Sequence, residues 1–191
     1  GDAESEARMA EAFKAHPPDV LVHAAHAFHP HQPIAALKPA PFAEGLRVNV
    51  AGAYALLRMA ARVMARRGGG RILVVGSLAS VTGGFAQAGY VTEKAALEGL
   101  VRAIASELAS KGVIANIVHP GIVRTENVEA RIDGRIAAAY AARTVAGRLL
   151  EPAEVAAATL HMVDPAIAAI TGQAIVLSGG AHMPFSRGDA E

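Results

Sequence analysis

Short apolar runs and longer amphipathic stretches alternate along most of the chain. Four runs have the length of buried strands, at residues 19–22, 71–76, 113–118 and 174–177. Elsewhere apolar positions recur at three- and four-residue steps, which predicts helices at residues 4–15, 42–67, 90–110, 132–146 and 153–162. The proline-rich segment 26–41 shows no periodicity and is expected to be a loop. Because strands and helices alternate, the pattern predicts an α/β fold: a doubly wound parallel sheet with helices on both faces.

The composition is that of a globular and nearly neutral protein. The chain has 191 residues, of which 52% are hydrophobic, and we expect a single domain over residues 1–191. Lys and Arg number 18 against 17 Asp and Glu, so no strongly basic surface predicts a nucleic-acid partner. The chain has no Cys, its first residues are acidic and polar, and no apolar run reaches the roughly 18 residues that cross a bilayer. These features predict a cytoplasmic protein without a membrane partner.

One pair of residues on a predicted helix indicates acid–base chemistry. Tyr90 and Lys94 are four positions apart, so a helix places the phenol and the ammonium group on one face. A free phenol has a pKa of about 10, and a nearby positive charge favours the phenolate and lowers this pKa. Such a phenol is suited to exchanging protons with an alcohol or a ketone. For the pair taken alone, coincidence is the alternative interpretation.

Two further polar residues favour the chemical interpretation. Ser77 directly follows a predicted strand, so its hydroxyl is expected at the carboxyl edge of the sheet, where ligands bind in open α/β folds. Asn49 lies inside a long predicted helix although Asn is a poor helix former, so we expect it to have another role.

With these residues at this spacing, the chain resembles the short-chain dehydrogenase/reductase family, whose fold is Rossmann-like. The resemblance extends from about residue 19 to residue 183 in the order of the family. The matching segments are Arg47-Val48-Asn49-Val50, Arg71 to Ser77 with Tyr90 and Lys94, Asn116 to Thr125, Gly147 to Val155, and Ile170 to Gly180.

The resemblance implies a role for each matching residue. Tyr90 would be the general acid/base, and Lys94 would lower its pKa and hold the nicotinamide ribose. Ser77 would bind the substrate oxygen, and Asn49 would hold a water that links Lys94 to solvent. The implied cofactor is NAD or NADP, and the implied substrate is a small-molecule alcohol or ketone such as a 3-oxoacyl compound. The residues implied to contact the cofactor are Ala25, Tyr90, Lys94, Pro120, Gly121, Ile122 and Thr125.

The chain departs from the family pattern in two places. The opening strand and the Gly-rich turn that receives the pyrophosphate have no counterpart, so roughly 50 N-terminal residues of the pattern are absent. Gly68-Gly69-Gly70 ends a helix instead of opening one and does not supply this turn. The expected explanations are a fragment of a longer enzyme or a naturally shortened relative without dinucleotide binding. His26 replaces a family glycine, and its side chain is expected to crowd the adenosine.

Three weaker features each have two interpretations. The histidines His23, His26, His29 and His31 favour a loop near the substrate over a metal site, and no metal is expected. Residues 132–146 form either a lid over the substrate or an ordinary surface helix. In the resembled family, the helices at 42–67 and 90–110 pair between subunits, which implies a homodimer or homotetramer; plain core packing is the alternative.

Two functions from different classes follow from these observations. The first is an oxidoreductase that transfers a hydride between a nicotinamide cofactor and a secondary alcohol or ketone. The second is a catalytically idle binding or scaffold protein that does not hold a dinucleotide. The complete set of Ser77, Asn49, Tyr90 and Lys94 favours the first, and the absent Gly-rich turn favours the second.

Overall fold

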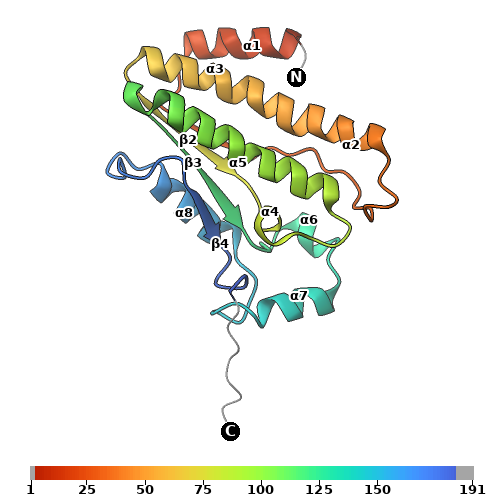
Figure 1. Cartoon of the computed structure of the whole chain (residues 1–191). Helices are drawn as coiled ribbons and strands as arrows, with labels where there is room; N and C mark the ends of the chain where they lie inside the picture. The colour runs from red at the N-terminus through yellow and green to blue at the C-terminus, as the bar shows by residue number, and fades with distance from the viewer. Residues whose placement is uncertain (1–2, 184–191) are drawn as a thin grey trace.

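A sheet of four parallel strands forms the centre of the molecule (Figure 1). The structure is a computed structural model and describes residues 3–183. The strands lie in the order β1 (Val20–His23), β2 (Gly70–Val75), β3 (Val113–Pro120) and β4 (Ala174–Leu177). Because every neighbouring pair is parallel, all four carboxyl ends point to the same edge of the sheet.

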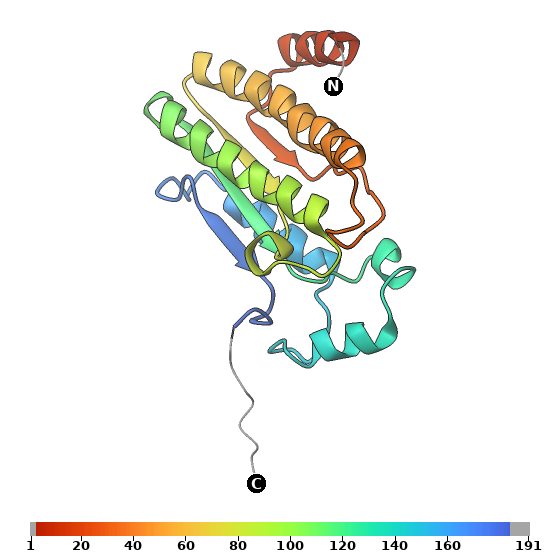
Figure 2. The ribbon, with the colours of Figure 1, turned by 45° about the vertical axis from the view of Figure 1, so that its right-hand side comes forward.

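Helices cover both faces of this sheet (Figures 1 and 2). The helices on one side are α1 (Ala3–Ala15), α2 (Pro39–Gly45), the π-helix η1 (Leu46–Ala51), α3 (Gly52–Arg66), α5 (Ala88–Leu108) and the 3-10 turn η2 (Ala109–Lys111). On the other side lies α8 (Pro152–Met162), and the short helices α4 (Ala79–Thr82), α6 (Glu126–Glu129) and α7 (Gly134–Ala141) lie toward the carboxyl edge. The predicted α/β fold with a doubly wound parallel sheet is confirmed.

Several element boundaries differ from the predicted ones for local physical reasons. The helix expected at 42–67 begins at Pro39, because proline is tolerated in the first helical turn. The helix expected at 132–146 is confined to α7, whose start is fixed by the Asp133 side chain accepting from the Arg135 N–H. The third strand continues to Pro120, and Gly121 N–H then donates to the Leu177 carbonyl at 2.8 Å. Helices α4 and α6 have only four residues each, too few to show a periodic pattern.

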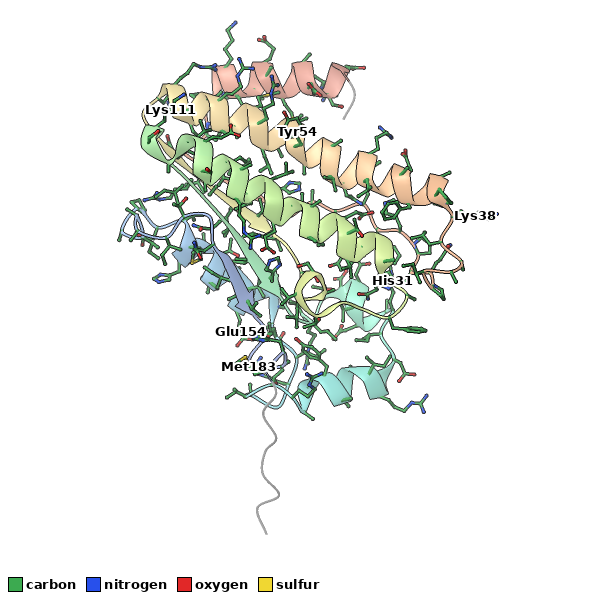
Figure 3. All side chains as sticks on the ribbon, viewed as in Figure 1. His31, Lys38, Tyr54, Lys111, Glu154 and Met183 are labelled. Carbon is green, nitrogen blue, oxygen red and sulfur yellow. The ribbon has the colours of Figure 1, made fainter. Side chains whose placement is uncertain are left out.

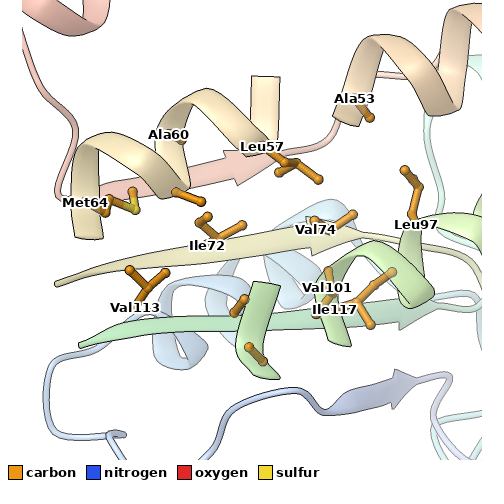
Figure 4. Packing of buried hydrophobic residues seen from close by; sticks show 13 residues of the cluster. Ala53, Leu57, Ala60, Met64, Ile72, Val74, Leu97, Val101, Val113 and Ile117 are labelled. Atoms are coloured by element: carbon orange, nitrogen blue, oxygen red, sulfur yellow. The ribbon is translucent and has the colours of Figure 1, made fainter. Parts of the chain in front are cut away.

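The larger core lies between the sheet and the pair of helices α3 and α5 (Figure 4). Leu57 on α3 and Leu97 on α5 are almost fully buried against Ile72, Val74 and Ile117 of the central strands. On the opposite face, a smaller cluster joins Leu73, Val118, Met162 and Val163. Strands β2 and β3 are therefore buried on both faces, which explains their continuous apolar sequences.

Replacing a core leucine tests the packing between α3 and the sheet. Leu57 is 1% exposed, so Leu57→Ala leaves a cavity and is expected to lower the free energy of unfolding by about 2–5 kcal/mol. Leu160 on α8 is 69% exposed, and Leu160→Ala is the control, with an expected change within about 0.5 kcal/mol. Urea unfolding followed by circular dichroism measures both. Equal effects of the two substitutions would contradict this account of the core.

Candidate active site at the carboxyl edge of the sheet

The loop after β2 and the first turns of α5 bring three of the four expected catalytic side chains into one region. Ser77 lies two residues beyond the end of β2, and Tyr90 and Lys94 lie on α5. The Ser77 side chain lies close enough to the Tyr90 phenol to lower the pKa of this phenol by hydrogen bonding. The amine Nζ of Lys94 lies 6.0 Å from the centroid of the Tyr90 ring. The expected neighbourhood of the serine, the phenol and the amine is thus present in the structure.

Burial dominates the acid–base properties of Tyr90. Removal from water raises the pKa of the phenol above 10, the hydrogen bond with Ser77 opposes this, and the negative charge of Glu93 adds to it. The sequence predicted the opposite direction, because it assigned the dominant effect to the Lys94 charge. That prediction is wrong for this structure: the phenol is protonated at neutral pH.

Lys94 is buried although it carries an amine. Its side chain is 4% exposed, and Nζ donates to the carbonyl oxygen of Val75 at 3.0 Å. Burial lowers the pKa of this amine to about 8, while the nearby Glu93 opposes the shift. The hydrogen bond to Val75 fixes the amine at the carboxyl end of β2, next to the position of Ser77.

Asn49 lies in the π-helix η1, and its side chain is 7% exposed. Its Oδ1 accepts from the Ala27 N–H at 2.7 Å, which fixes the orientation of the amide. Its Nδ2 lies 3.0 Å from the Ala27 carbonyl and 2.9 Å from Oε2 of Glu93, both within hydrogen-bond distance. The amide thus ties α5 to the loop after β1, whereas the predicted water link to Lys94 stays a prediction. Single π turns of this kind occur frequently at functional sites.

The residues expected to contact a cofactor lie at the same edge of the sheet. Ala25 is exposed in the loop after β1, and the Pro120–Ile122 turn begins at the last residue of β3, which pairs with Leu177 of β4. A side chain at Gly121 would collide with the phenol of Tyr140, so α7 packs directly onto this turn. The Thr125 hydroxyl accepts from the Val128 N–H at 3.3 Å and thereby caps α6, a role that the sequence did not predict.

His119, which the sequence did not indicate as functional, holds the backbone of Ser77 in place by a hydrogen bond. Its ring is completely buried, its Nδ1 accepts from the Ser77 N–H at 3.1 Å, and its Nε2 lies 3.0 Å from Oε2 of Glu98. The backbone N–H can only donate, so Nε2 carries the hydrogen that Glu98 accepts. Any side chain at position 76 would collide with the His119 ring, which explains Gly76. No periodic pattern indicates this contact, because it joins two neighbouring strands.

Glu93 is the second functional candidate that the sequence analysis missed. Its carboxylate is 2% exposed and lies beside Asn49 and His26. The sequence did contain a signal for Glu93: it is three residues after Tyr90, and residues three apart lie on the same face of a helix.

Three of the four histidines, His26, His29 and His31, line a pocket at the site, whereas His23 is buried in β1. A pocket of about 120 Å³ is lined by His26, His29, His31, Tyr90 and Glu93 among others. His31 lies near the start of α5 (Figure 3), with its ring centroid 6.0 Å from that of Tyr90. Within residues 3–183, no group of three or more His, Cys, Asp or Glu side chains is placed to hold a metal ion. In the same part of the chain, no helix is long and apolar enough to cross a membrane.

The pKa of Lys94 predicts how stability depends on pH. The amine has a pKa of about 8 in the folded protein against 10.5 for an ordinary lysine, so the unfolded chain binds more protons between these values. The Lys94 contribution to the free energy of unfolding therefore rises with pH above about 8, by at most about 1.4 kcal/mol per pH unit. Above pH 10 the raised pKa of Tyr90 acts in the opposite sense, so pH 8 to 10 is the informative range.

Lys94→Met is expected to remove this slope, as measured by urea unfolding at a series of pH values. Lys111 is exposed in η2, the turn that follows α5 (Figure 3), and Lys111→Met is the matched control that keeps the slope. A slope that survives Lys94→Met would show that another group titrates in this range.

Comparison with known proteins places the chain in a family. A family model described as Enoyl-(Acyl carrier protein) reductase matches residues 1–182. The chain is 33% identical over 147 residues to a 3-oxoacyl-[acyl-carrier-protein] reductase of Vibrio cholerae, covering 77% of this chain and 60% of that protein. It is 37% identical over 142 residues to the corresponding reductase MabA of Mycobacterium avium, covering 74% and 55%. The chain thus spans about 60% or less of the length of these curated relatives.

Solved structures give the same result. A gluconate 5-dehydrogenase from Burkholderia cenocepacia in complex with NADP and tartrate superposes with a TM-score of 0.86 at 28% identity, covering 95% of this chain and 71% of that one. A short chain dehydrogenase/reductase family protein superposes with a TM-score of 0.81 at 32% identity, covering 94% and 72%. The chain has the Rossmann-like fold and belongs to the short-chain dehydrogenase/reductase family.

Proposed function

We propose that the protein is an oxidoreductase that transfers a hydride between NAD or NADP and a secondary alcohol or ketone. The observation that carries this proposal is the meeting of Ser77, Tyr90 and Lys94 at the carboxyl end of β2. The curated relatives named as 3-oxoacyl-[acyl-carrier-protein] reductases support a 3-oxoacyl compound as the substrate class.

The charge states of the site suit the reduction of a ketone. Burial keeps the Tyr90 phenol protonated, so the phenol starts as a proton donor for the oxygen of the substrate. The Ser77 hydroxyl lies beside this phenol and is placed to donate a hydrogen bond to the substrate oxygen as negative charge develops there. The Lys94 ammonium stabilises the phenolate that remains after the proton has left. The nicotinamide cofactor, when bound, supplies the hydride.

The residues present fit the nicotinamide end of such a cofactor. Lys94 gives one hydrogen to the Val75 carbonyl, and an ammonium group has two more for ribose hydroxyls. Gly121 has no side chain in the turn after β3, and the Tyr140 phenol occupies the space that one would fill. The sequence contains no Gly-rich turn for the pyrophosphate, so this chain's own residues account for one half of the cofactor only.

The remaining features belong to the same proposal. Residues 1–191 form one Rossmann-like domain that works in the cytoplasm as a homodimer or homotetramer. Helices α3 and α5 provide the subunit interface in this arrangement. The protein binds a small-molecule alcohol or ketone and neither nucleic acid nor membrane.

Replacing the phenol by a phenyl ring tests the proposed acid–base role. In the full-length protein, Tyr90→Phe removes the proton donor and is expected to reduce the turnover of a 3-oxoacyl thioester at least about 100-fold, with an unchanged thermal melting curve. Tyr54 is 51% exposed on the outer side of α3 (Figure 3), and Tyr54→Phe is the control that keeps full activity. The loss of nicotinamide absorbance measures turnover with NADH and with NADPH, which also identifies the preferred cofactor.

The outcome separates the two functions. Full activity of the Tyr90→Phe protein would exclude Tyr90 as the acid/base. A folded full-length wild-type protein that shows neither dinucleotide binding in calorimetry nor turnover would support a catalytically idle binding or scaffold protein.

A further inference from the structure

Glu93 is a buried carboxylate in a site whose proposed chemistry has no use for it. Its Oε2 accepts from Asn49 Nδ2 at 2.9 Å and lies 2.8 Å from Nε2 of His26. Because Ala27 N–H donates to the Asn49 oxygen, the amide nitrogen faces Glu93 and acts as the donor. A carboxylate costs several kcal/mol to bury unless it is compensated, and these two bonds supply the compensation.

The fold makes room specifically for this carboxylate. A side chain at Gly45, at the end of α2, would collide with Oε1 of Glu93. Gly45 is buried, and its lack of a side chain lets the carboxylate fit between α2 and α5. Glu93, Gly45 and Asn49 are therefore a matched set of residues from α5 and from the two consecutive segments α2 and η1.

His26 connects this carboxylate to the reactive phenol. Its ring centroid lies 5.2 Å from that of Tyr90, and the two rings meet edge to face at 85°. Such contacts favour one relative orientation of two rings. At the position where the resembled family has glycine, the imidazole turns toward Glu93 and Tyr90, and its side chain is only 14% exposed. The histidine thus contacts both the carboxylate and the phenol, and the expected crowding of the adenosine stays a prediction.

We propose that Glu93 and His26 form a positioning pair for Tyr90: the carboxylate holds the imidazole, and the imidazole holds the phenol ring in its reactive orientation. The role of the oriented phenol rests on the proposed oxidoreductase function, whereas the positioning itself is testable without substrate. Both residues act through Tyr90 and touch no reacting atom.

The charges around the pair define how its loss affects Tyr90. The negative Glu93 favours the protonated phenol, and the packed His26 ring keeps water away from it. Removing either effect should stabilise the phenolate and lower the pKa of Tyr90. The other titratable groups facing this cluster are Lys94 on α5, His23 in β1, His29 and His31 in the following loop, and Glu44 on α2 beside His29.

The experiment is a titration of Tyr90 in the wild type and in two variants. The chain has three tyrosines and no tryptophan, so the ultraviolet absorbance of tyrosinate reports on Tyr54, Tyr90 and Tyr140 alone, and subtraction of a Tyr90→Phe titration isolates Tyr90. Glu93→Gln keeps the shape but removes the charge, and His26→Ala removes the ring. Each is expected to lower the midpoint of the Tyr90 titration by about half a pH unit or more.

A carboxylate elsewhere on α5 provides the control for this titration. Glu107 is an exposed carboxylate on the same helix, and Glu107→Gln should leave the midpoint in place. An unchanged midpoint in both folded variants, or loss of the folded state in both, would overturn the positioning role. If the midpoint shifts as expected while the wild type reduces no ketone, the pair stands and the oxidoreductase proposal fails. If the wild type reduces a ketone but neither variant shifts the midpoint, the oxidoreductase proposal stands and the positioning pair fails.

Discussion

The arrangement of the site depends on the apolar packing of α5 against the two central strands. Leu97 and Val101 on this helix are buried against the sheet, one and two turns beyond the polar segment that carries Tyr90 and Lys94. Because the helix is rigid, the packing of Leu97 and Val101 also fixes the positions of Tyr90 and Lys94 relative to the carboxyl end of β2. Ser77 reaches the same place along the strand itself. The site is thus assembled by hydrophobic burial, and its polar contacts refine a position that the core has already set.

Burial also determines the charge states in the site. The same packing that aligns the phenol and the amine removes both from water, which favours their neutral forms. The pKa of the amine falls from 10.5 to about 8 and that of the phenol rises above 10, so the two values move apart and the amine loses its proton at a lower pH than the phenol. The negative charge of Glu93 raises the pKa of both groups, so it opposes the effect of burial on the amine and adds to the effect of burial on the phenol. The site therefore holds a neutral proton donor next to a cation that a buried carboxylate helps to maintain.

The sequence was sufficient to predict the fold and the region of the site, but not its electrostatics. The apolar runs at β2 and β3 and the spacing of Tyr90 and Lys94 are local features, and each was visible along the chain. The pairing of His119 with Ser77 and of His26 with Glu93 joins residues far apart in sequence. The direction of the Tyr90 pKa was misjudged because burial depends on the surrounding fold, whereas the Lys94 charge could be read from spacing alone. The short helices α4 and α6 were missed because four residues carry no periodic signal.

The collision that any side chain at Gly76 would make with His119 has a consequence for altering this protein. Gly76 directly follows β2 and His119 lies in the adjacent strand β3, and because a side chain at 76 would occupy the space of the His119 ring, the two amino acids cannot be chosen independently. An alanine at position 76 becomes acceptable only beside a smaller residue at 119, and that residue would no longer accept the Ser77 N–H. Variants of the loop that carries Ser77 therefore have to change positions 76 and 119 together, because single substitutions at either position meet the unchanged partner.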